Sequence, residues 1–352
     1  MSLEEEGFFY HNEVAMFGKK KPQPDISICI PVYNTERYLE QCLQSVIEQD
    51  FPGVIEVIVV SDSSPGRDET GRTAEKIVKD FRSKNIRYLE NSQNLSLIET
   101  RRRLVSEARG KYIFMLDSDD FLPKNALSSL YDAAIKNDAD IVQGDCVTLD
   151  AEGKNHIEST NEVYAYDGIL EGKEIFDACF CDHKYRAYIT TKLIKTDIYQ
   201  KAFEEIPYIK VHMAEEVIQY FFIALYSKKY VGMNLPVYNY RIAEGITVRR
   251  ITSLEDWEKI CSTASIITAL FAWVEERTHI DGKSPLDEKE LKTLNQMAKA
   301  YCVDNVKQLR SSVIPELYEN ARSLLCDYWG EQAVVNTEEF LEKNTDSNPQ
   351  NF

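Results

Sequence analysis

Hydrophobic runs and helical stripes alternate through the first 145 residues of the chain. The clearest run, Tyr112–Leu116, holds five apolar or aromatic residues without a break, which favours a strand buried on both faces. Apolar residues at helical spacing predict helices between such runs. We expect strands at 25–34, 54–60, 86–89, 112–116 and 140–143, and helices at 38–47, 68–81, 96–108 (ended by Gly110) and 123–137. This alternation predicts a doubly wound, mostly parallel α/β sheet with right-handed crossovers.

Three of the predicted strands end in polar residues. Tyr33 and Asn34 end the first strand, Asp62 follows the second, and Asp117-Ser118-Asp119-Asp120 follows the fourth. The carboxyl ends of parallel strands lie along one edge of a sheet, where such proteins bind ligands. An Asp can accept a hydrogen bond from a base N–H or a ribose hydroxyl, and a metal can bridge a diphosphate to carboxylates. The pattern therefore predicts a site for a ribonucleotide and a divalent metal.

The acidic segment has two interpretations. Its three carboxylates lie within four residues and repel one another unless a cation or donor groups neutralise them, and Mn²⁺ or Mg²⁺ suits such oxygen ligands. Alternatively, Asp119 or Asp120 caps a helix that begins near Pro123. Asp62 likewise has the alternative of an Asx-turn residue that starts a loop. The residues by themselves leave both alternatives open.

Composition narrows the class of protein. The 352 residues suffice for two domains, and the formal net charge of -17 argues against a general nucleic-acid binder. The eight cysteines are irregularly spaced without a CxxC pair, so we expect reduced thiols in a cytoplasmic protein. No stretch reaches transmembrane length, and the amino terminus lacks the features of a signal peptide. The basic run Lys19–Lys21 is interpreted as a solvated linker, with a contact at the inner face of the membrane as the alternative.

Several nucleotide and hydrolase motifs are missing from the sequence. The first strand is not followed by G-x-G-x-x-G, which argues against a dinucleotide-binding Rossmann site. Neither G-x-x-x-x-G-K-[ST] nor the G-x-S-x-G elbow of α/β-hydrolases occurs. A nucleotidyltransferase would normally show a Gly-rich phosphate loop where Pro31-Val-Tyr-Asn34 stands.

Residues 26–145 resemble the family 2 glycosyltransferases, which have a GT-A fold, and the resemblance continues to about residue 250. The matching pieces are Ile-Pro-Val-Tyr-Asn34, Leu39–Gln49, Ile-Val-Val-Ser-Asp62-Ser-Ser, Asn94–Gly110 and Leu116-Asp-Ser-Asp-Asp-Phe-Leu122. The resemblance implies inverting transfer of a sugar from a nucleotide sugar, first of all a UDP-sugar, to a hydroxyl. The implied acceptor is a glycan or a lipid-linked sugar in surface polysaccharide synthesis.

The resemblance also implies roles at the donor side. Asp62 would hydrogen-bond the uracil, and Asp117 would lie at the ribose and the sugar side. Asp119 of the family's D-x-D motif would be the direct metal ligand, together with Asp117. Asp120 would position the metal or cap the next helix. Arg101 would lie near the diphosphate and neutralise its charge. The remaining implied donor contacts are Pro31, Tyr33, Asn34 and Ser118.

This sequence departs from the family pattern after the third strand. Ser96 stands where the family usually has a Gly, Arg102 replaces an Asn, and Leu104 replaces a later Gly. A side chain at position 96 bears on how closely backbone and ligand approach.

Glu215 and Glu216 occupy the place where the family usually has Glu-Asp at the start of a helix. The resemblance implies that Glu216 is the general base that deprotonates the acceptor, with Glu215 as its neighbour. The alternative is that both acids complement the helix dipole. The implied candidates for phosphate or acceptor contacts are Lys192, Arg241 and Arg249.

We expect five segments along the chain. They are an N-terminal tail (1–24), a nucleotide-sugar-binding half (25–145), the acceptor-binding half of the same domain (146–250), a helical region (251–342) and a polar tail (343–352). The helical region is expected to pack on the core or to form a homo-oligomer contact. A rival function is a glycosyltransferase-like scaffold that binds sugar nucleotides without turnover, because the segment around Ser96 and the base position are both substituted.

Overall fold

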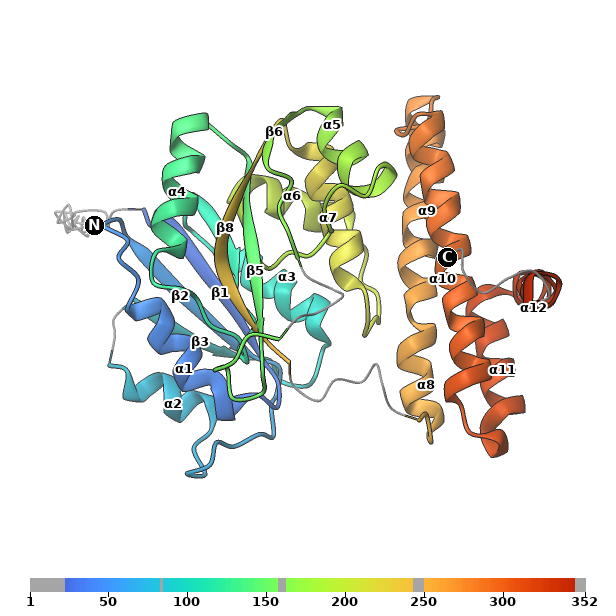
Figure 1. Ribbon diagram of the computed structural model, residues 1–352, viewed down its shortest axis with the longest axis horizontal. Coiled ribbons are helices and arrows are strands. Elements are labelled where there is room, and N and C mark those ends of the chain that lie inside the picture. Colours follow the sequence, from blue (N-terminus) through green and yellow to red (C-terminus); the bar gives the residue numbers. More distant parts are fainter. Residues whose placement is uncertain (1–22, 83–84, 158–162, 243–249, 346–352) are drawn as a thin grey trace, which may run out of the picture.

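The computed structural model describes residues 23–82, 85–157, 163–242 and 250–345. Its centre is an eight-stranded sheet in the order β3-β2-β1-β4-β7-β5-β8-β6 (Figure 1). The strands are β1 (Ile26–Val32), β2 (Ile55–Ser61), β3 (Ile86–Glu90), β4 (Tyr112–Met115), β5 (Ile141–Leu149), β6 (Gly168–Glu171), β7 (Lys192–Lys195) and β8 (Lys229–Arg241). The predicted α/β class is confirmed.

The first four strands are all parallel, whereas β7 runs antiparallel to both β4 and β5. Residues Tyr112–Leu116 are at most 1% exposed, as expected for a strand with apolar layers on both faces. The parallel half places the ends of β1, β2 and β4 at one edge. Sequence patterning therefore located the polar strand ends correctly.

Helices cover both faces of the sheet, each over its own apolar core (Figure 1). One face carries α1 (Glu36–Ile47), α2 (Ala74–Asp80) and α4 (Ala126–Asn137). The other carries α3 (Leu97–Glu107), α5 (Lys173–Phe176), the π-helix η1 (Asp177–Cys181), α6 (Thr196–Glu205) and α7 (Glu215–Tyr226).

The C-terminal helices extend this second core rather than forming a detached unit. They are α8 (Leu254–Cys261), α9 (Thr263–Asp281), α10 (Glu288–Ser312), the 3-10 helix η3 (Pro315–Leu317), α11 (Tyr318–Trp329) and α12 (Glu331–Thr345). Trp273 of α9 packs edge-on against Phe221 and Phe222 of α7, with ring centroids 6.2 and 5.0 Å apart. A third core, around the buried Trp257, joins α8, α10, α11 and α12. Helix α12 continues to Thr345, so the start of the expected polar tail is helical.

Two helix ends differ from the prediction. The last residue of helix α3 is Glu107. The next residue, Ala108, has an extended backbone conformation and forms the C-cap, so Gly110 does not cap the helix. Gly110 instead lies against β1, where a Cβ atom would come within 2.6 Å of the Ser27 nitrogen. Helix α2 begins at Ala74 rather than Asp68, because the Asp68 carboxylate accepts the backbone N–H of Arg72 and closes a loop first.

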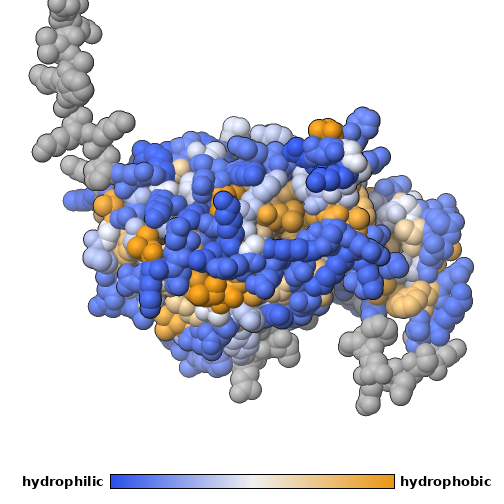
Figure 2. All heavy atoms as spheres, turned by 90° about the horizontal axis from the view of Figure 1, so that it is seen from above, coloured by the Kyte–Doolittle hydropathy of each residue, from blue (hydrophilic) through white to orange (hydrophobic). Residues whose placement is uncertain are grey.

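One face of the molecule shows how polar and apolar side chains are distributed on its surface (Figure 2). On the face drawn in Figure 2, hydrophilic residues predominate and hydrophobic side chains form small patches among them. All eight cysteines are free thiols, as expected from their spacing. Across the residues that the structure describes, no helix has the length and apolar character needed to cross a membrane.

Ser96 has a backbone conformation that normally requires glycine. Its φ of 84° and ψ of 161° lie in a region that L-residues avoid, and its buried Oγ has no hydrogen-bond partner in the described structure. The Ser96 N–H nevertheless donates to Asp62 Oδ2 at 3.1 Å, which holds the backbone in place. The glycine that the family usually has here would adopt this conformation without strain.

We expect Ser96→Gly to raise the free energy of unfolding by about 1 kcal/mol, because relief of a strain of about 1–3 kcal/mol exceeds the entropic cost of glycine. Urea denaturation followed by circular dichroism measures the change. Ser129→Gly in the regular helix α4 is the control and should lower stability by about 0.5–1 kcal/mol. An equal loss in both variants would contradict the strain at Ser96.

Candidate active site

The carboxyl end of β1 lies between β2 and β4, which pair with opposite sides of β1. Such a switch point is where α/β sheets bind ligands. The last bond between β1 and β4 runs from Leu116 N–H to the Cys29 carbonyl at 3.0 Å. Pro31 lies two residues further along the same side of β1, and because it has no N–H it cannot continue the ladder with β4. Pro31 thus marks the point where the two strand ends become available to a ligand.

The residues after β1 line this edge. The Tyr33 side chain is 47% exposed, so its ring is available to a ligand. The Asn34 N–H donates to Ser64 Oγ at 2.8 Å, which ties the end of β1 to the loop after β2. The hydroxyl of Ser118 lies 2.6 Å from that of Thr35 and ties the same segment to the acidic strand end. The three polar strand ends therefore meet, as the sequence predicted.

Asp62 is buried and organises the loop between β3 and α3. Its carboxylate accepts hydrogen bonds from Asn91 Nδ2 at 2.7 Å, the Leu95 N–H at 2.9 Å and the Ser96 N–H at 3.1 Å. These partners lie about thirty residues away, so the alternative of a local Asx-turn is wrong. The contact of Asp62 with a uracil stays a prediction.

Asp120 is anchored to β8. Its two oxygens accept the Tyr238 hydroxyl at 2.8 Å and the Arg241 N–H at 2.8 Å. Burial, followed by the charges of Asp119 and Asp117, raises the pKa of the Asp120 carboxyl well above its usual range. Helix α4 begins only at Ala126, with Asn125 at its N-cap position, so the expectation that Asp119 or Asp120 caps it is wrong.

Asp119 and Asp117 are the acids left for a ligand. Burial, then the Asp117 charge, raises the pKa of Asp119 to about 6. Asp117 is partly exposed and also accepts a hydrogen bond from Arg101. In the described part of the chain, no three His, Cys, Asp or Glu side chains are grouped to hold a metal ion. Two carboxylates do fit Mn²⁺ or Mg²⁺, because Mg²⁺ is commonly held by one or two carboxylates together with substrate phosphates and water.

Arg101 joins the acidic strand end to α7. Its guanidinium is 1% exposed and lies 2.9 Å from Glu215, 3.1 Å from Asp117 and 3.4 Å from Glu216. Burial lowers the pKa of Arg101, but the three carboxylates outweigh it and raise that pKa above its usual value. A direct contact with a phosphate, as the resemblance implied, would require Arg101 to exchange these partners.

Glu216 has the properties of a base that works near neutral pH. Helix α7 begins at Glu215, directly after Ala214 in the left-handed conformation (φ 60°), and this strained turn aims the first helical residues at the site. Burial is the main cause that raises the pKa of Glu216 to about 7; Glu215 and Asp117 add to it and Arg101 opposes it. A carboxyl with this pKa can accept a proton at physiological pH.

Two of the three predicted cationic contacts, Lys192 and Arg241, are buried and hydrogen-bonded within the protein. Lys192 donates to the carbonyls of Arg186, at 3.0 Å, and Tyr188, and burial lowers the pKa of its ammonium to about 8. Arg241 Nε donates to the Asp119 carbonyl at 2.8 Å. The rest of the Arg241 guanidinium donates to the Ala151 carbonyl and to Gln41 Oε1. Arg249 lies outside the described residues. A phosphate or acceptor contact by any of the three stays a prediction.

A cavity of about 570 Å³ opens beside Glu216. Its walls are the segment from Cys179 to Tyr188, the first residues of α7, and Met297, Ala300 and Tyr301 of α10. The sequence pattern does not assign α10 to the site. Its spacing is that of an ordinary packed helix, and nothing local in the sequence indicates a neighbour more than eighty residues away.

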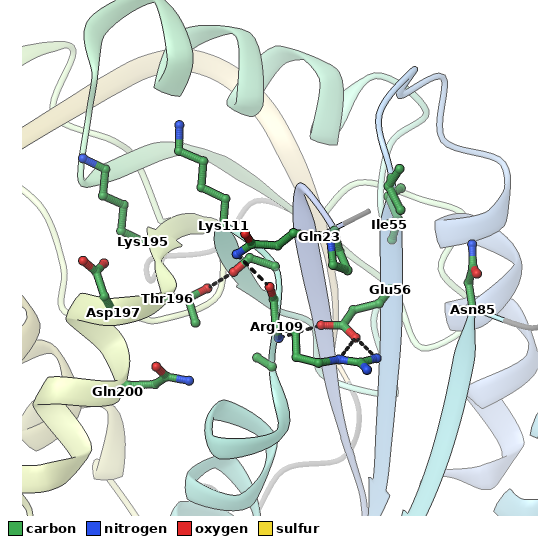
Figure 3. A pocket seen from close by; sticks show the side chains of 14 residues that line it. Gln23, Ile55, Glu56, Asn85, Arg109, Lys111, Lys195, Thr196, Asp197 and Gln200 are labelled. Carbon is green, nitrogen blue, oxygen red and sulfur yellow. Dashed lines mark hydrogen bonds and ion pairs between the residues drawn. The ribbon is translucent and has the colours of Figure 1, made fainter. Parts of the chain in front are cut away.

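A larger cavity, of about 1040 Å³, lies at the opposite edge of the sheet (Figure 3). It adjoins the amino ends of β1, β2 and β4, away from the polar strand ends. Arg109 in its wall is paired with Glu56 at 2.7 Å, and Lys195 is paired with Asp140 at 2.8 Å. These charges are already paired, and parallel sheets bind ligands at the carboxyl ends of their strands rather than at the amino ends. We therefore do not assign the active site to this cavity.

Residues 27–196 match the model of the family described as glycosyl transferase family 2. The matched segment makes up 170 of the 352 residues, just under half of the chain. The predicted resemblance and the predicted enzyme class, a glycosyltransferase, are thereby confirmed for this segment. The roles of individual site residues stay predictions.

Two curated relatives come from Streptococcus pneumoniae serotype 4. The chain is 27% identical to glycosyltransferase GlyA over 66% of its own length and 28% identical to glycosyltransferase GlyG over 64%. The match spans about a third of GlyA (32%) but 73% of GlyG. The crystal structure of residues 1–349 of S. aureus TarS, in complex with UDP-GlcNAc, aligns with a TM-score of 0.50 at 19% identity. That alignment covers 90% of this chain and 92% of the TarS chain, and confirms the predicted fold.

The two neighbouring acids should behave differently when removed. Asp120→Ala is expected to lower the free energy of unfolding by about 2 kcal/mol, because it leaves the Tyr238 hydroxyl and the Arg241 N–H without their acceptor. Asp119→Ala should change stability by less than about 0.5 kcal/mol or raise it, since it relieves repulsion between carboxylates. Urea denaturation measures both variants, and equal losses would contradict this division of roles.

Proposed function

We propose that the chain is an inverting, metal-dependent glycosyltransferase that moves a sugar from a UDP-sugar to a hydroxyl of a surface glycan or polysaccharide precursor. The observation that carries the proposal is the convergence of Asp117, Glu215 and Glu216 on buried Arg101. This arrangement joins the acidic strand end, which suits a diphosphate donor, to a candidate base. The crystal structure of TarS, a protein of the same fold, contains UDP-GlcNAc, which supports a UDP-sugar as the donor.

Glu216 is the general base of the proposed reaction. It removes the proton of the acceptor hydroxyl while that oxygen attacks the anomeric carbon, and the nucleoside diphosphate leaves from the opposite face. Arg101 holds Glu216 at the site, 3.4 Å away, and opposes the rise of its pKa, so that part of the population is ionised near neutral pH. A Mn²⁺ or Mg²⁺ ion, held by Asp119 and Asp117, would supply positive charge that stabilises the leaving diphosphate.

The donor-binding side of the proposal uses the edge formed by β1, β2 and β4. Tyr33 offers an exposed ring for the base, while Pro31 and Asn34 shape the strand end. Ser118 would face the ribose and the sugar. Asp62 holds the loop before α3 through the N–H groups of Leu95 and Ser96. We further propose that Asp62 contacts the uracil of the donor.

The free thiols support a reducing compartment, and we propose that the enzyme works in the cytoplasm or at the inner face of the membrane on a glycan or lipid-linked acceptor. The basic run Lys19–Lys21 lies outside the described residues. Homo-oligomer formation through the C-terminal helices stays a prediction.

Purified protein should hydrolyse a UDP-sugar slowly when Mn²⁺ is added, because water can replace the acceptor. Screening UDP-, GDP- and dTDP-sugars by thermal shift identifies the donor, since a bound ligand raises apparent stability. Asp119→Ala should lower the metal-stimulated rate by about 100-fold or more without a matching loss of stability. Full activity of Asp119→Ala would overturn the metal role, and binding of UDP without any turnover would favour the scaffold alternative.

The rate should rise with pH through about 7, because only ionised Glu216 can take the proton and its carboxyl has a pKa of about 7. Below this pH the carboxyl is protonated and the rate falls. Glu216→Gln should remove this dependence and lower kcat by about 10²–10⁴-fold, whereas Glu216→Asp should retain part of both. The measurement is a pH–rate profile of UDP-sugar hydrolysis. An unchanged profile in Glu216→Gln would exclude Glu216 as the base.

A further inference from the structure

The cavity beside Glu216 has the size of a ligand site. Its volume of about 570 Å³ lies within the range of pockets that hold small molecules. Its walls come from three parts of the chain: the segment Cys179–Tyr188, the start of α7, and α10 of the C-terminal region. A molecule bound here would lie against Glu216, away from the strand ends that suit a donor.

The aromatic side chains of Tyr188 and Tyr301 line the cavity from two different segments. Tyr301 is half-buried on α10, and burial, followed by the nearby Tyr188, raises the pKa of its phenol to about 12. Tyr188 is exposed at the same cavity, on the opposite segment. Within the described structure neither phenol oxygen has a hydrogen-bond partner. Flat rings with a free hydroxyl suit a sugar or polyol, which presents C–H faces and hydroxyl groups.

Arg186 gives the cavity a positive charge. Its side chain is exposed at the cavity wall, and in the described part of the chain no carboxylate lies within ion-pair distance of it. The position of its backbone is fixed, because buried Lys192 donates to the Arg186 carbonyl at 3.0 Å. Glu216 at the same cavity is already paired with Arg101. The guanidinium of Arg186 is therefore available to a bound molecule in a protein of net charge -17.

We infer that this cavity is the acceptor site of the proposed transferase, and that it takes a sugar or polyol bearing an anionic group, a phosphate or a carboxylate. A guanidinium binds either group through two parallel hydrogen bonds. Arg186 takes the anionic group, Tyr188 and Tyr301 pack on the sugar, and Glu216 faces the accepting hydroxyl. The inference rests on the proposed function.

The proposed reaction forms one bond, breaks one bond and transfers one proton. The acceptor oxygen forms a bond to the anomeric carbon, the bond from that carbon to the donor phosphate breaks, and the nucleoside diphosphate leaves with the electron pair. The acceptor proton passes to Glu216. Helix α10 thereby makes the C-terminal region part of the acceptor site.

Three probes test the anionic preference: methyl glucoside, its 6-phosphate, and methyl glucuronide. Their binding to the full chain in the presence of UDP is measured by isothermal titration calorimetry. At least one charged probe should bind wild type about tenfold or more tightly than methyl glucoside, and Arg186→Gln should remove that preference. Lys184→Gln is the matched control, because Lys184 lies on the same segment, outside the cavity wall, with its ammonium over the Tyr166 ring. This variant should keep the preference.

The two charged probes identify the source of the charge: tighter binding of the 6-phosphate indicates a phosphorylated acceptor, and tighter binding of the glucuronide indicates a uronic acid. Tyr301→Ala should weaken all three probes alike. The inference is overturned if wild type does not distinguish charged from neutral probes, or if Arg186→Gln keeps the distinction. Hydrolysis of a UDP-sugar by wild type is measured separately. If it occurs without a charge preference, only the acceptor inference fails, whereas its absence with every sugar nucleotide defeats the proposed function itself.

Discussion

The buried ion cluster around Arg101 is the interaction on which the site depends. Three carboxylates grouped at one place repel one another, and Arg101 is the cation that contacts all three. A buried ion group of this kind costs desolvation, and its loss on one side leaves uncompensated charge. Arg101 on α3, Asp117 after β4 and Glu215 on α7 are distant in sequence, so the cluster fixes how these three parts of the fold meet.

The three acids of the segment 117–120 next to this cluster make different contacts. Asp120 is bonded to β8 through Tyr238 and the Arg241 backbone, so it holds the segment rather than a ligand. The Arg241 guanidinium then fixes the carbonyl of Asp119. The side chains of Asp117 and Asp119 remain oriented by these anchors. Burying one acid thus positions the two that face the ligand.

The sequence predicted those features that depend on local pattern and on topology. Apolar runs identify the strands, and parallel strands bring their polar ends to one edge, so the meeting of Tyr33, Asp62 and Asp117 was foreseeable. Contacts between residues that are distant in sequence could not be predicted in this way. That Asp62 holds the loop before α3, or that α10 borders the cavity at Glu216, depends on tertiary packing that no local pattern encodes. Gly110 shows the same limit, because the close approach of β1 explains it better than its position after a helix does.

Helix α10 reaches the cavity from a region that lies after the sheet in the chain and packs both on the second core and through a third core. The residues of the polar strand ends and those that complete the cavity wall at Tyr301 are thus encoded in separate stretches. Substitutions in the later stretch can reshape the cavity without disturbing the strand ends. Under the proposed function, a fold arranged in this way allows acceptor preference to diverge while the use of the same donor is maintained.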